Sequence, residues 1–214
     1  SMQDLDSVLQ SAKEWARECG ELQLEYFRSS KLHSSAKLNE CDIVTEADGR
    51  SEAIILKHIA EEFPGHSVLG EETGCHQGSS QWRWVIDPLD GTTNFKAGLP
   101  MFAVSIALER NGESVLGVVY APYLDEMFTA VKGCGAHLNG KPLHCSSSDE
   151  LARSVVCTGF PVSKAVNPDN NLENFTRVMP GVRGIRRLGS AALDLSYVGA
   201  GFLDAYWELH LHRW

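Results

Sequence analysis

Residues 84–95 read Trp-Val-Ile-Asp-Pro-Leu-Asp-Gly-Thr-Thr-Asn-Phe, an apolar run that ends in two carboxylates three positions apart. The apolar run is typical of a short buried strand, and we expect Pro88 and Gly91 to break it. Asp87 and Asp90 would then project from one strand-to-loop turn, where two negative charges are unfavourable without a cation. Oxygen ligands on a tight loop suit Mg²⁺, which takes about six oxygens and keeps water among them. Asp-Pro and Asp-Gly are also ordinary turn formers, but the whole string predicts a cation site.

Composition limits the classes of protein that the chain can belong to. It has 214 residues, 43% of them hydrophobic and 22% charged, enough for a substantial core. The net charge of −9 disfavours a nucleic-acid partner, which needs a basic face, although solubility alone also accounts for such a charge. No apolar stretch is long enough for a signal region or a membrane span, so we expect a cytoplasmic protein without a membrane partner. Six scattered cysteines lack zinc spacing and are expected to be reduced.

Two amphipathic helices are expected to open the chain. Residues 4–27 place apolar side chains at helical spacing, which predicts a helix with one buried face. Residues 29–39 form a polar loop, and residues 42–45 have the character of a short extended segment. A second helix is expected over residues 46–63, and Pro64-Gly65 ends it.

From residue 67 onward the hydrophobic period changes to two, which predicts strands. The expected strands are Val68–Gly70, Trp82–Ile86, Phe102–Leu108, Val115–Tyr120, Met127–Val131, Ser154–Thr158 and Leu203–Leu209. Asn111-Gly112 and Asn139-Gly140 are hairpin signals, and helices are expected over 170–179 and 190–200. This order predicts a layered α/β sandwich. We divide it into an N-terminal α/β half with a metal site, residues 3–145, and part of a C-terminal α/β half on the substrate side, residues 146–214.

Further carboxylates lie where the predicted elements begin or end. Asp48 stands near the start of the second helix, and Glu71 and Glu72 follow the strand at residues 68–70. Such element ends can converge on one pocket and hold two or three divalent ions. For Asp48 taken alone, a solvated acid or a helix N-cap is the alternative interpretation.

The stretch at residues 84–95, together with Gly70-Glu71-Glu72, resembles the inositol monophosphatase family of Mg²⁺-dependent, lithium-sensitive phosphatases. Residues 42–48, with Lys37 before them, resemble the family's upstream segment, and residues 188–192 and 204–208 resemble its downstream segments. The similarity runs in family order over nearly the whole chain. It implies a sugar-phosphatase-type α/β/α/β/α sandwich with largely antiparallel sheets, the last layer being incomplete in this chain.

The resemblance implies a metal role for several matching residues. Glu71, Asp87 and the backbone carbonyl of Leu89 would hold a first metal, and Asp87 and Asp90 would share a second. Glu71 would also support a further ion, so that two or three Mg²⁺ ions would bind. Two such ions activate a water and stabilise the leaving oxygen in an in-line displacement. No motif for a covalent nucleophile competes with this chemistry.

The resemblance also implies the residues that meet the substrate. Asp48, beside Thr92, would orient the attacking water. The backbone N–H groups of Gly91 and Thr92 would receive the phosphate. The alcohol half of the substrate would lie against Gly189, Ser190, Ala191 and Glu208, with Glu208 accepting hydrogen bonds from hydroxyl groups. Family members are commonly homodimers, so a homodimer is also expected.

The substrate is expected to be a small polyol phosphate, most simply inositol 1-phosphate. Superfamily members that act on nucleotides commonly carry Lys-Gly-Phe after Asp-Gly-Thr, and fructose bisphosphatases carry Ser-Ser-Asn, where this chain has Thr93-Asn94-Phe95. Histidinol phosphate and fructose 1,6-bisphosphate remain alternative substrates. A non-catalytic metal-binding protein with the same fold is the alternative from another class.

The end of the chain departs from the family pattern. In the family, the segment after Glu208 continues to a Trp-Asp pair whose Asp is a ligand of the second metal, whereas this sequence stops at Trp214. We therefore expect apolar faces around residues 190–209 to lack cover. We also expect the second metal to bind weakly. His210 and His212 are expected at exposed positions of the last strand.

Overall fold

The computed structural model describes residues 4–29 and 40–214. Its first part has two long helices and an eight-stranded sheet. The elements are α1 (Leu5–Tyr26), α3 (Glu40–Glu62), β1 (Ser67–Gly70), β2 (Gly74–His76), β3 (Trp82–Asp90), α4 (Thr92–Ala97), β4 (Ala103–Arg110), β5 (Glu113–Ala121), β6 (Glu126–Val131), β7 (Ala136–Leu138) and β8 (Lys141–Pro142).

The second part is built around a three-stranded sheet. Its elements are the 3-10 turn η1 (Leu151–Arg153), β9 (Val155–Thr158), α5 (Leu172–Val178), the 3-10 turn η2 (Met179–Gly181), β10 (Gly184–Arg186), α6 (Ala191–Gly199) and β11 (Ala205–Trp207). The expected division of the chain near residue 145 stays a prediction.

The large sheet has the strand order β2-β1-β3-β4-β5-β6-β7-β8 and is antiparallel except between β1 and β3. The small sheet, in the order β10-β9-β11, is parallel at both pairings. Parallel neighbours need crossover connections, and α5 and α6 supply them here. The mixed α/β architecture confirms the predicted fold class, although the second sheet is parallel and not antiparallel.

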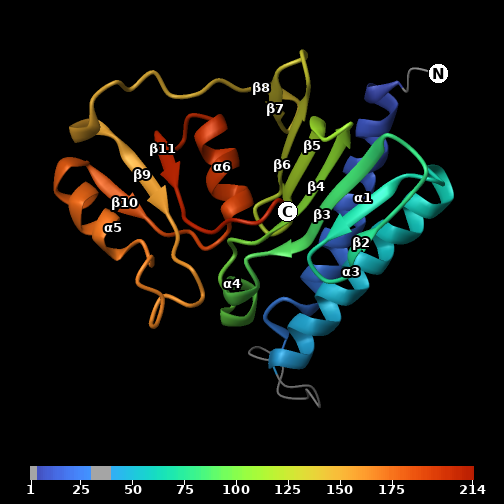
Figure 1. The fold of residues 1–214 in the computed structure, drawn as a ribbon, viewed down its shortest axis with the longest axis horizontal. Helices are drawn as coiled ribbons and strands as arrows, with labels where there is room; N and C mark the ends of the chain where they lie inside the picture. The colour runs from blue at the N-terminus through green and yellow to red at the C-terminus, as the bar shows by residue number, and fades with distance from the viewer. Residues whose placement is uncertain (1–3, 30–39) are drawn as a thin grey trace.

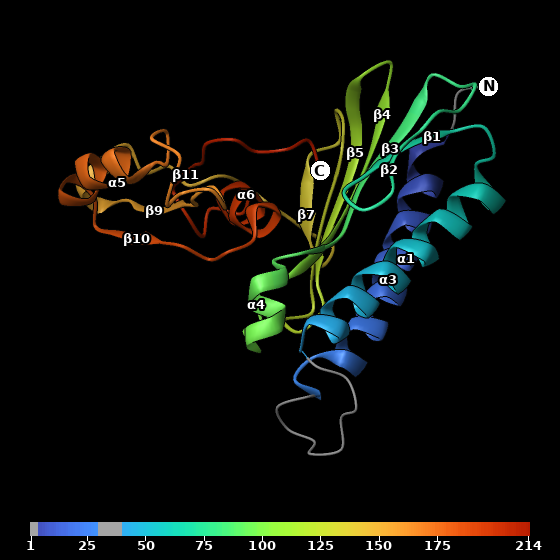
Figure 2. The ribbon, with the colours of Figure 1, turned by 60° about the horizontal axis from the view of Figure 1, so that its bottom comes forward.

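Helices α1 and α3 lie against one face of the large sheet, and α6 with the small sheet lies on the other side (Figures 1 and 2). The predicted apolar stripe of α1 forms the core here: Val8, Ala12, Trp15, Ala16 and Cys19 are all buried. They pack with alternate residues of β3, β4 and β5, as period-two strands with one covered face require.

Three predictions about local structure are wrong. Residues 42–45 are helical and belong to α3, which begins at Glu40. The helix is favoured here because it buries Ile43 and Ala47 in a cluster with Phe27. Strand β3 does not break at Pro88 but runs on to Asp90, past a register shift after Asp87. The last strand, β11, is shorter than expected and ends at Trp207, so His210 and His212 lie beyond it.

Several secondary-structure elements that the sequence did not predict are short. Strands β2, β7 and β8 have three residues or fewer, and α4 has six, too few to show a period. The loop expected over residues 29–39 lies almost wholly outside the described residues, as does Lys37. The cysteines whose side chains the structure describes are free, in line with the expectation: Cys19, Cys75, Cys134, Cys145 and Cys157. No helix among the described residues is long and apolar enough to cross a membrane.

Candidate active site

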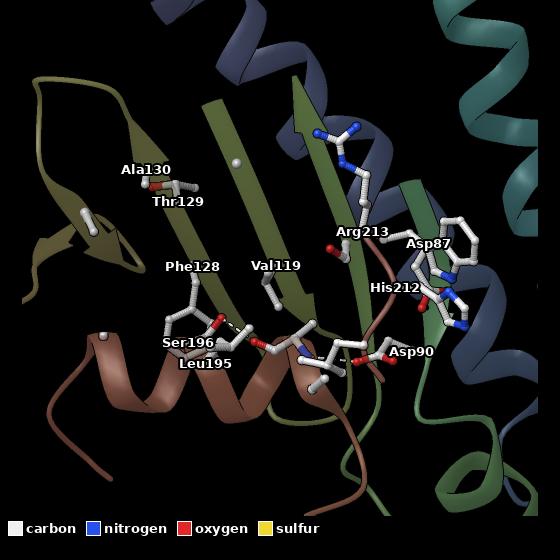
Figure 3. Close-up of a pocket in the computed structure, with 18 of the residues that line it drawn as sticks. Asp87, Asp90, Val119, Phe128, Thr129, Ala130, Leu195, Ser196, His212 and Arg213 are labelled. Carbon is white, nitrogen blue, oxygen red and sulfur yellow. Dashed lines mark hydrogen bonds between the residues drawn. The ribbon is translucent and has the colours of Figure 1, made fainter. Parts of the chain in front are cut away.

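Three predicted metal ligands meet where β1 and β3 end. The two strands are parallel neighbours with Gly70 opposite Ile86, so the residues that follow, Glu71 and Asp87, lie side by side. All three carboxylates, Glu71, Asp87 and Asp90, line a cavity of about 550 Å³. Figure 3 shows Asp87 and Asp90 at one end of it. The sequence had placed these carboxylates at element ends, and the parallel register brings them together.

The crowding of carboxylates is costly in the protein alone. Asp87 is only 4% exposed, and burial, followed by the charges of Asp90 and Glu71, raises its pKa well above the ordinary value. Burial likewise raises the pKa of Glu71. These shifts mean that the cluster resists ionising in the absence of a nearby positive charge.

The irregular end of β3 leaves backbone groups free for other partners. Pro88 and Leu89 fall at the register shift and have no partner in β4. The Pro88 carbonyl instead accepts a hydrogen bond of 2.7 Å from Nε2 of Gln23, a fully buried residue of α1. The Leu89 N–H donates to Oδ1 of Asp87 over 3.2 Å. Gln23, which sequence reasoning missed, thus supports the loop that carries the predicted Leu89 ligand.

Asp90 is held by the second part of the molecule. Its Oδ2 accepts hydrogen bonds from the Ser190 hydroxyl at 2.6 Å and from the Ala192 N–H at 3.0 Å. Ser190 is the N-cap of α6, so a carboxylate sits at the start of this helix, where negative charge is favoured. The Ser190 side chain, predicted to meet substrate, is therefore bonded to Asp90. Its neighbour Ala191 lines the cavity.

The predicted phosphate-binding turn has little free space around it. Gly91 has φ 92°, and a Cβ there would lie 2.8 Å from the Met101 carbonyl, so only glycine fits. It precedes Thr92, the first residue of α4. Asn94 donates 2.7 Å hydrogen bonds to the carbonyls of Met101 and Leu188, and so ties this turn to the segment that carries Gly189.

Asp48 lies inside α3 and not at its start, so the N-cap interpretation is wrong. Its Oδ1 and Oε2 of Glu52, one turn later, are buried without a hydrogen-bond partner in the described part of the chain. Burial, then the charges of Glu72 and Glu71, raise the pKa of Asp48 to about 7. Oε1 of Glu52 accepts from the Thr73 N–H at 3.2 Å, so this residue, missed from the sequence, fixes the turn after Glu71.

Glu208 is the residue that directly follows β11. It does not line the cavity, and neither do Asp48, Gly91, Thr92, Gly189 and Ser190. Its Oε2 accepts a 2.6 Å hydrogen bond from the Tyr206 hydroxyl. A further buried acid, Asp194, accepts a hydrogen bond from the Cys157 thiol. Burial raises the pKa of Asp194 to about 6; the bond from Cys157 partly offsets this shift, and the charges of Glu208 and Asp90 add to it.

Much of the remaining cavity wall is apolar. Val119 and Phe128 of the sheet face Leu195 of α6, while His212 and Arg213 stand at the acidic end near Asp87 (Figure 3). His212 is exposed, as expected, yet it lines the cavity. Leu195 and Phe202 are each 54% exposed, which agrees with the expectation of uncovered apolar side chains around residues 190–209.

The donor set fits a hard cation. Carboxylate oxygens and a backbone carbonyl are the ligands that Mg²⁺ prefers. The charge of Asp48, whose buried Oδ1 has no hydrogen-bond partner in the described part of the chain, also raises the pKa of Asp87. As the side chains stand, no group of three or more His, Cys, Asp and Glu residues in the described ranges is arranged to hold a metal ion. Ligands of this kind would therefore have to draw together around the cation.

Comparison with known proteins agrees with this geometry. The sequence profile of the inositol monophosphatase family matches residues 4–214. The chain belongs to that family. An inositol-1-monophosphatase of Mesorhizobium japonicum is 42% identical over 211 residues, which cover 98% of this chain and 76% of the relative. The structure of an inositol monophosphatase from Anabaena has a TM-score of 0.88 at 39% identity and covers 99% of this chain and 78% of its own.

Other relatives within the inositol monophosphatase family carry a different name. A protein of Pseudomonas aeruginosa called Nus factor SuhB is 42% identical over 218 residues, covering 98% of this chain and 79% of the relative. The family thus supports a phosphatase, while its names do not settle one substrate. The expectation that the chain has no nucleic-acid partner finds no support in these names and rests on net charge alone.

Proposed function

We propose that this protein is a Mg²⁺-dependent phosphomonoesterase that hydrolyses a small polyol phosphate, inositol 1-phosphate being the simplest case. The observation that carries the proposal is the meeting of Glu71, Asp87 and Asp90 at one end of a cavity, with the pKa of Asp87 raised by burial and by its neighbours. A cluster that resists ionising alone is a good receptor for cations, whose charge would restore the ionised form.

The ligands would be Glu71, Asp87, Asp90 and the Leu89 carbonyl, for two or three ions. Bound there, Mg²⁺ would lower the pKa of an attacking water and neutralise charge on the leaving oxygen. The hydrogen bonds from Ser190 and Ala192 orient Asp90 before any ligand arrives. Such preorganisation avoids an ordering cost during the reaction.

The remaining roles belong to the protein's own groups. Asp48, with a pKa near 7, is suited to accept a proton from water at neutral pH. Thr92 would help to orient that water, and the N–H groups of Gly91 and Thr92 would receive the phosphate. Gly189, Ala191 and Glu208 would contact the alcohol half of the substrate, while Ser190 would act there through its bond to Asp90.

Phosphate release from inositol 1-phosphate, histidinol phosphate and fructose 1,6-bisphosphate tests the proposal. We expect the first to be turned over fastest, only with Mg²⁺ present, and an Asp87→Asn variant to lose at least about 100-fold in rate. Faster turnover of either competitor would overturn the choice of substrate. Activity that survives chelation of metal would overturn the metal-dependent mechanism.

A second candidate is a role as a Nus factor, the name that several relatives carry. This role is compatible with the non-catalytic alternative. Metal binding measured by calorimetry, without phosphate release, would support that alternative. Titration with a single-stranded RNA would test the expectation of no nucleic-acid partner. A homodimer and a cytoplasmic location stay predictions, which sedimentation and fractionation can check.

A further inference from the structure

The carboxylate of Glu208 occupies the place of a missing side chain. A Cβ added to Gly159 would lie 1.4 Å from Oε1 and 2.4 Å from Cδ of Glu208. The φ of Gly159 is outside the left-handed region, so glycine is needed here for space and not for backbone conformation. Any other residue at position 159 would push the Glu208 carboxylate away from the end of β9.

The two oxygens of this carboxylate have different surroundings. Oε2 accepts the 2.6 Å hydrogen bond from Tyr206, whose pKa burial raises, so that the phenol remains a donor. Oε1 lies over Gly159, and no described residue donates a hydrogen bond to it. One oxygen is therefore fixed by the protein, and the other keeps its capacity to accept a hydrogen bond from a ligand.

A buried asparagine fixes both sides of this arrangement. Nδ2 of Asn171 donates to the carbonyl of Gly159 at 2.7 Å and to the Thr158 hydroxyl at 2.9 Å. Its Oδ1 accepts from Nε1 of Trp207 at 2.7 Å, next to Glu208. Asn171 is only 3% exposed, so these bonds are shielded from water and hold the glycine and the glutamate in register.

The charges around Glu208 also favour one class of ligand. The charges of Glu208 and Asp90 both act on the buried Asp194, and both raise its pKa. Arg187 is the cation that acts on Asp194, and it is exposed. A hydroxyl can donate to these carboxylates, whereas a second phosphate on this side would be repelled.

We propose that Gly159 and Tyr206 are positioning residues for substrate selection. Together they hold the Glu208 carboxylate so that Oε1 accepts a hydroxyl from the alcohol half of a polyol phosphate. This inference rests on the proposed phosphatase function and deepens it, because it names the residues that select a hydroxyl-bearing alcohol over one without hydroxyls.

The test compares inositol 1-phosphate with p-nitrophenyl phosphate, which has no hydroxyl for Glu208. Gly159→Ala should raise the KM for inositol 1-phosphate about 10-fold with little change in kcat, and change the KM for p-nitrophenyl phosphate less than about twofold. Tyr206→Phe should act in the same direction, by roughly 2–10-fold, the usual value of one hydrogen bond.

Two matched controls are available in the chain. Gly181→Ala adds the same methyl group where no atom of the described residues lies within 4 Å. Tyr197→Phe removes a similar 2.6 Å bond from a tyrosine to a carboxylate, that of Glu126, away from this site. Neither control should change the ratio of the two KM values. Urea unfolding of each variant shows whether it is folded under the assay conditions.

The outcomes separate this inference from the proposed function. Equal losses on both substrates in Gly159→Ala and Tyr206→Phe, or no loss on either, would overturn the inference while leaving a phosphatase. If the wild type turns over neither substrate, the proposed function fails. In that case, the affinities of the same two compounds, measured by calorimetry in the presence of Mg²⁺, take the place of KM. If the wild type prefers inositol 1-phosphate and both variants lose this preference, the positioning role is supported. If the wild type shows no such preference, the positioning role is overturned.

Discussion

The face of the large sheet that α1 and α3 cover differs sharply from the end of the same sheet where β1 and β3 stop. On the covered face, Trp15 and Trp84 are at most 1% exposed, and their rings lie 5.1 Å apart. At the end of the sheet, Asp48 and Asp87 are buried with raised pKa values, and one oxygen of Asp48 has no hydrogen-bond partner among the described residues. The first region stabilises the fold, and the second gives up stability to keep charged ligands in place.

The largest expected effect lies on the covered face. Trp84→Ala should lower the free energy of unfolding by about 3–5 kcal/mol, because it leaves a cavity among Trp15 and Phe63 and removes the hydrogen bond to His66. Urea unfolding measures this loss, and Trp84→Phe, which keeps most of the ring, should lose much less. A loss below about 1 kcal/mol would show that this face is less tightly packed than the structure indicates.

The opposite sign is expected at the acidic end. Without metal at neutral pH, Asp87→Asn should stabilise the fold by roughly 2–4 kcal/mol, since each unit of the raised pKa is worth about 1.4 kcal/mol. Added Mg²⁺ should raise the melting temperature of the wild type and leave that of the variant nearly unchanged. A destabilised Asp87→Asn variant would remove the contrast between the two regions.

A smaller, pH-dependent effect is expected at Asp194 of α6, a buried acid that feels the charge of Asp90 at the acidic end. Burial first, then the charges of Glu208 and Asp90, raise the pKa of Asp194 to about 6 from 3.8. For an acid whose pKa is raised by folding, the stabilisation is complete below the ordinary pKa and is lost as the pH rises through the folded value. Between about pH 4 and pH 7, Asp194→Asn should therefore gain roughly 2 kcal/mol over the wild type. Parallel stability curves for the two proteins would contradict this assignment.

The smallest effect is expected at an exposed ion pair on α5, with which the effects in both regions can be compared. Arg177 pairs with Glu173 one turn away on α5, and the two side chains are 72% and 78% exposed. Arg177→Ala should cost no more than about 0.5 kcal/mol, because water screens such pairs. A thermal unfolding scan is sufficient. A larger loss would mean that the second part of the molecule depends on surface charge more than on packing.

Regular periodicity made the covered face predictable. The stripe of α1 and the strands β3 to β6 follow from helical and alternating spacing. Asn111-Gly112 and Asn139-Gly140 form the expected turns, with positive φ at all four residues. The start of α3 was missed because the β-branched residues Ile43, Val44 and Thr45 favour extended structure locally. In the folded protein, burial of Ile43 in one cluster with Phe27 and Leu89 favours the helix.

The candidate site was only partly predictable. Its carboxylates could be named because they form a compact motif, and their convergence could be expected from strand ends. The supports could not be named: Gln23 and Glu52 come from helices, where a buried polar residue has no local signature. Asn94 has the same problem, since its bonding partner Leu188 lies 94 residues further along the chain.

By itself, the sequence determined the set of proposed metal ligands, because oxygen-bearing residues a few positions apart on one turn are a local property. It also determined the helices and strands whose apolar period spans several turns or pairs. Only the tertiary structure decided that Asp90 bonds to the start of α6, 102 residues away, and that Glu208 fills the space beside Gly159. Such contacts depend on how packed elements meet, and no pattern of neighbouring residues encodes the distance between two segments so far apart.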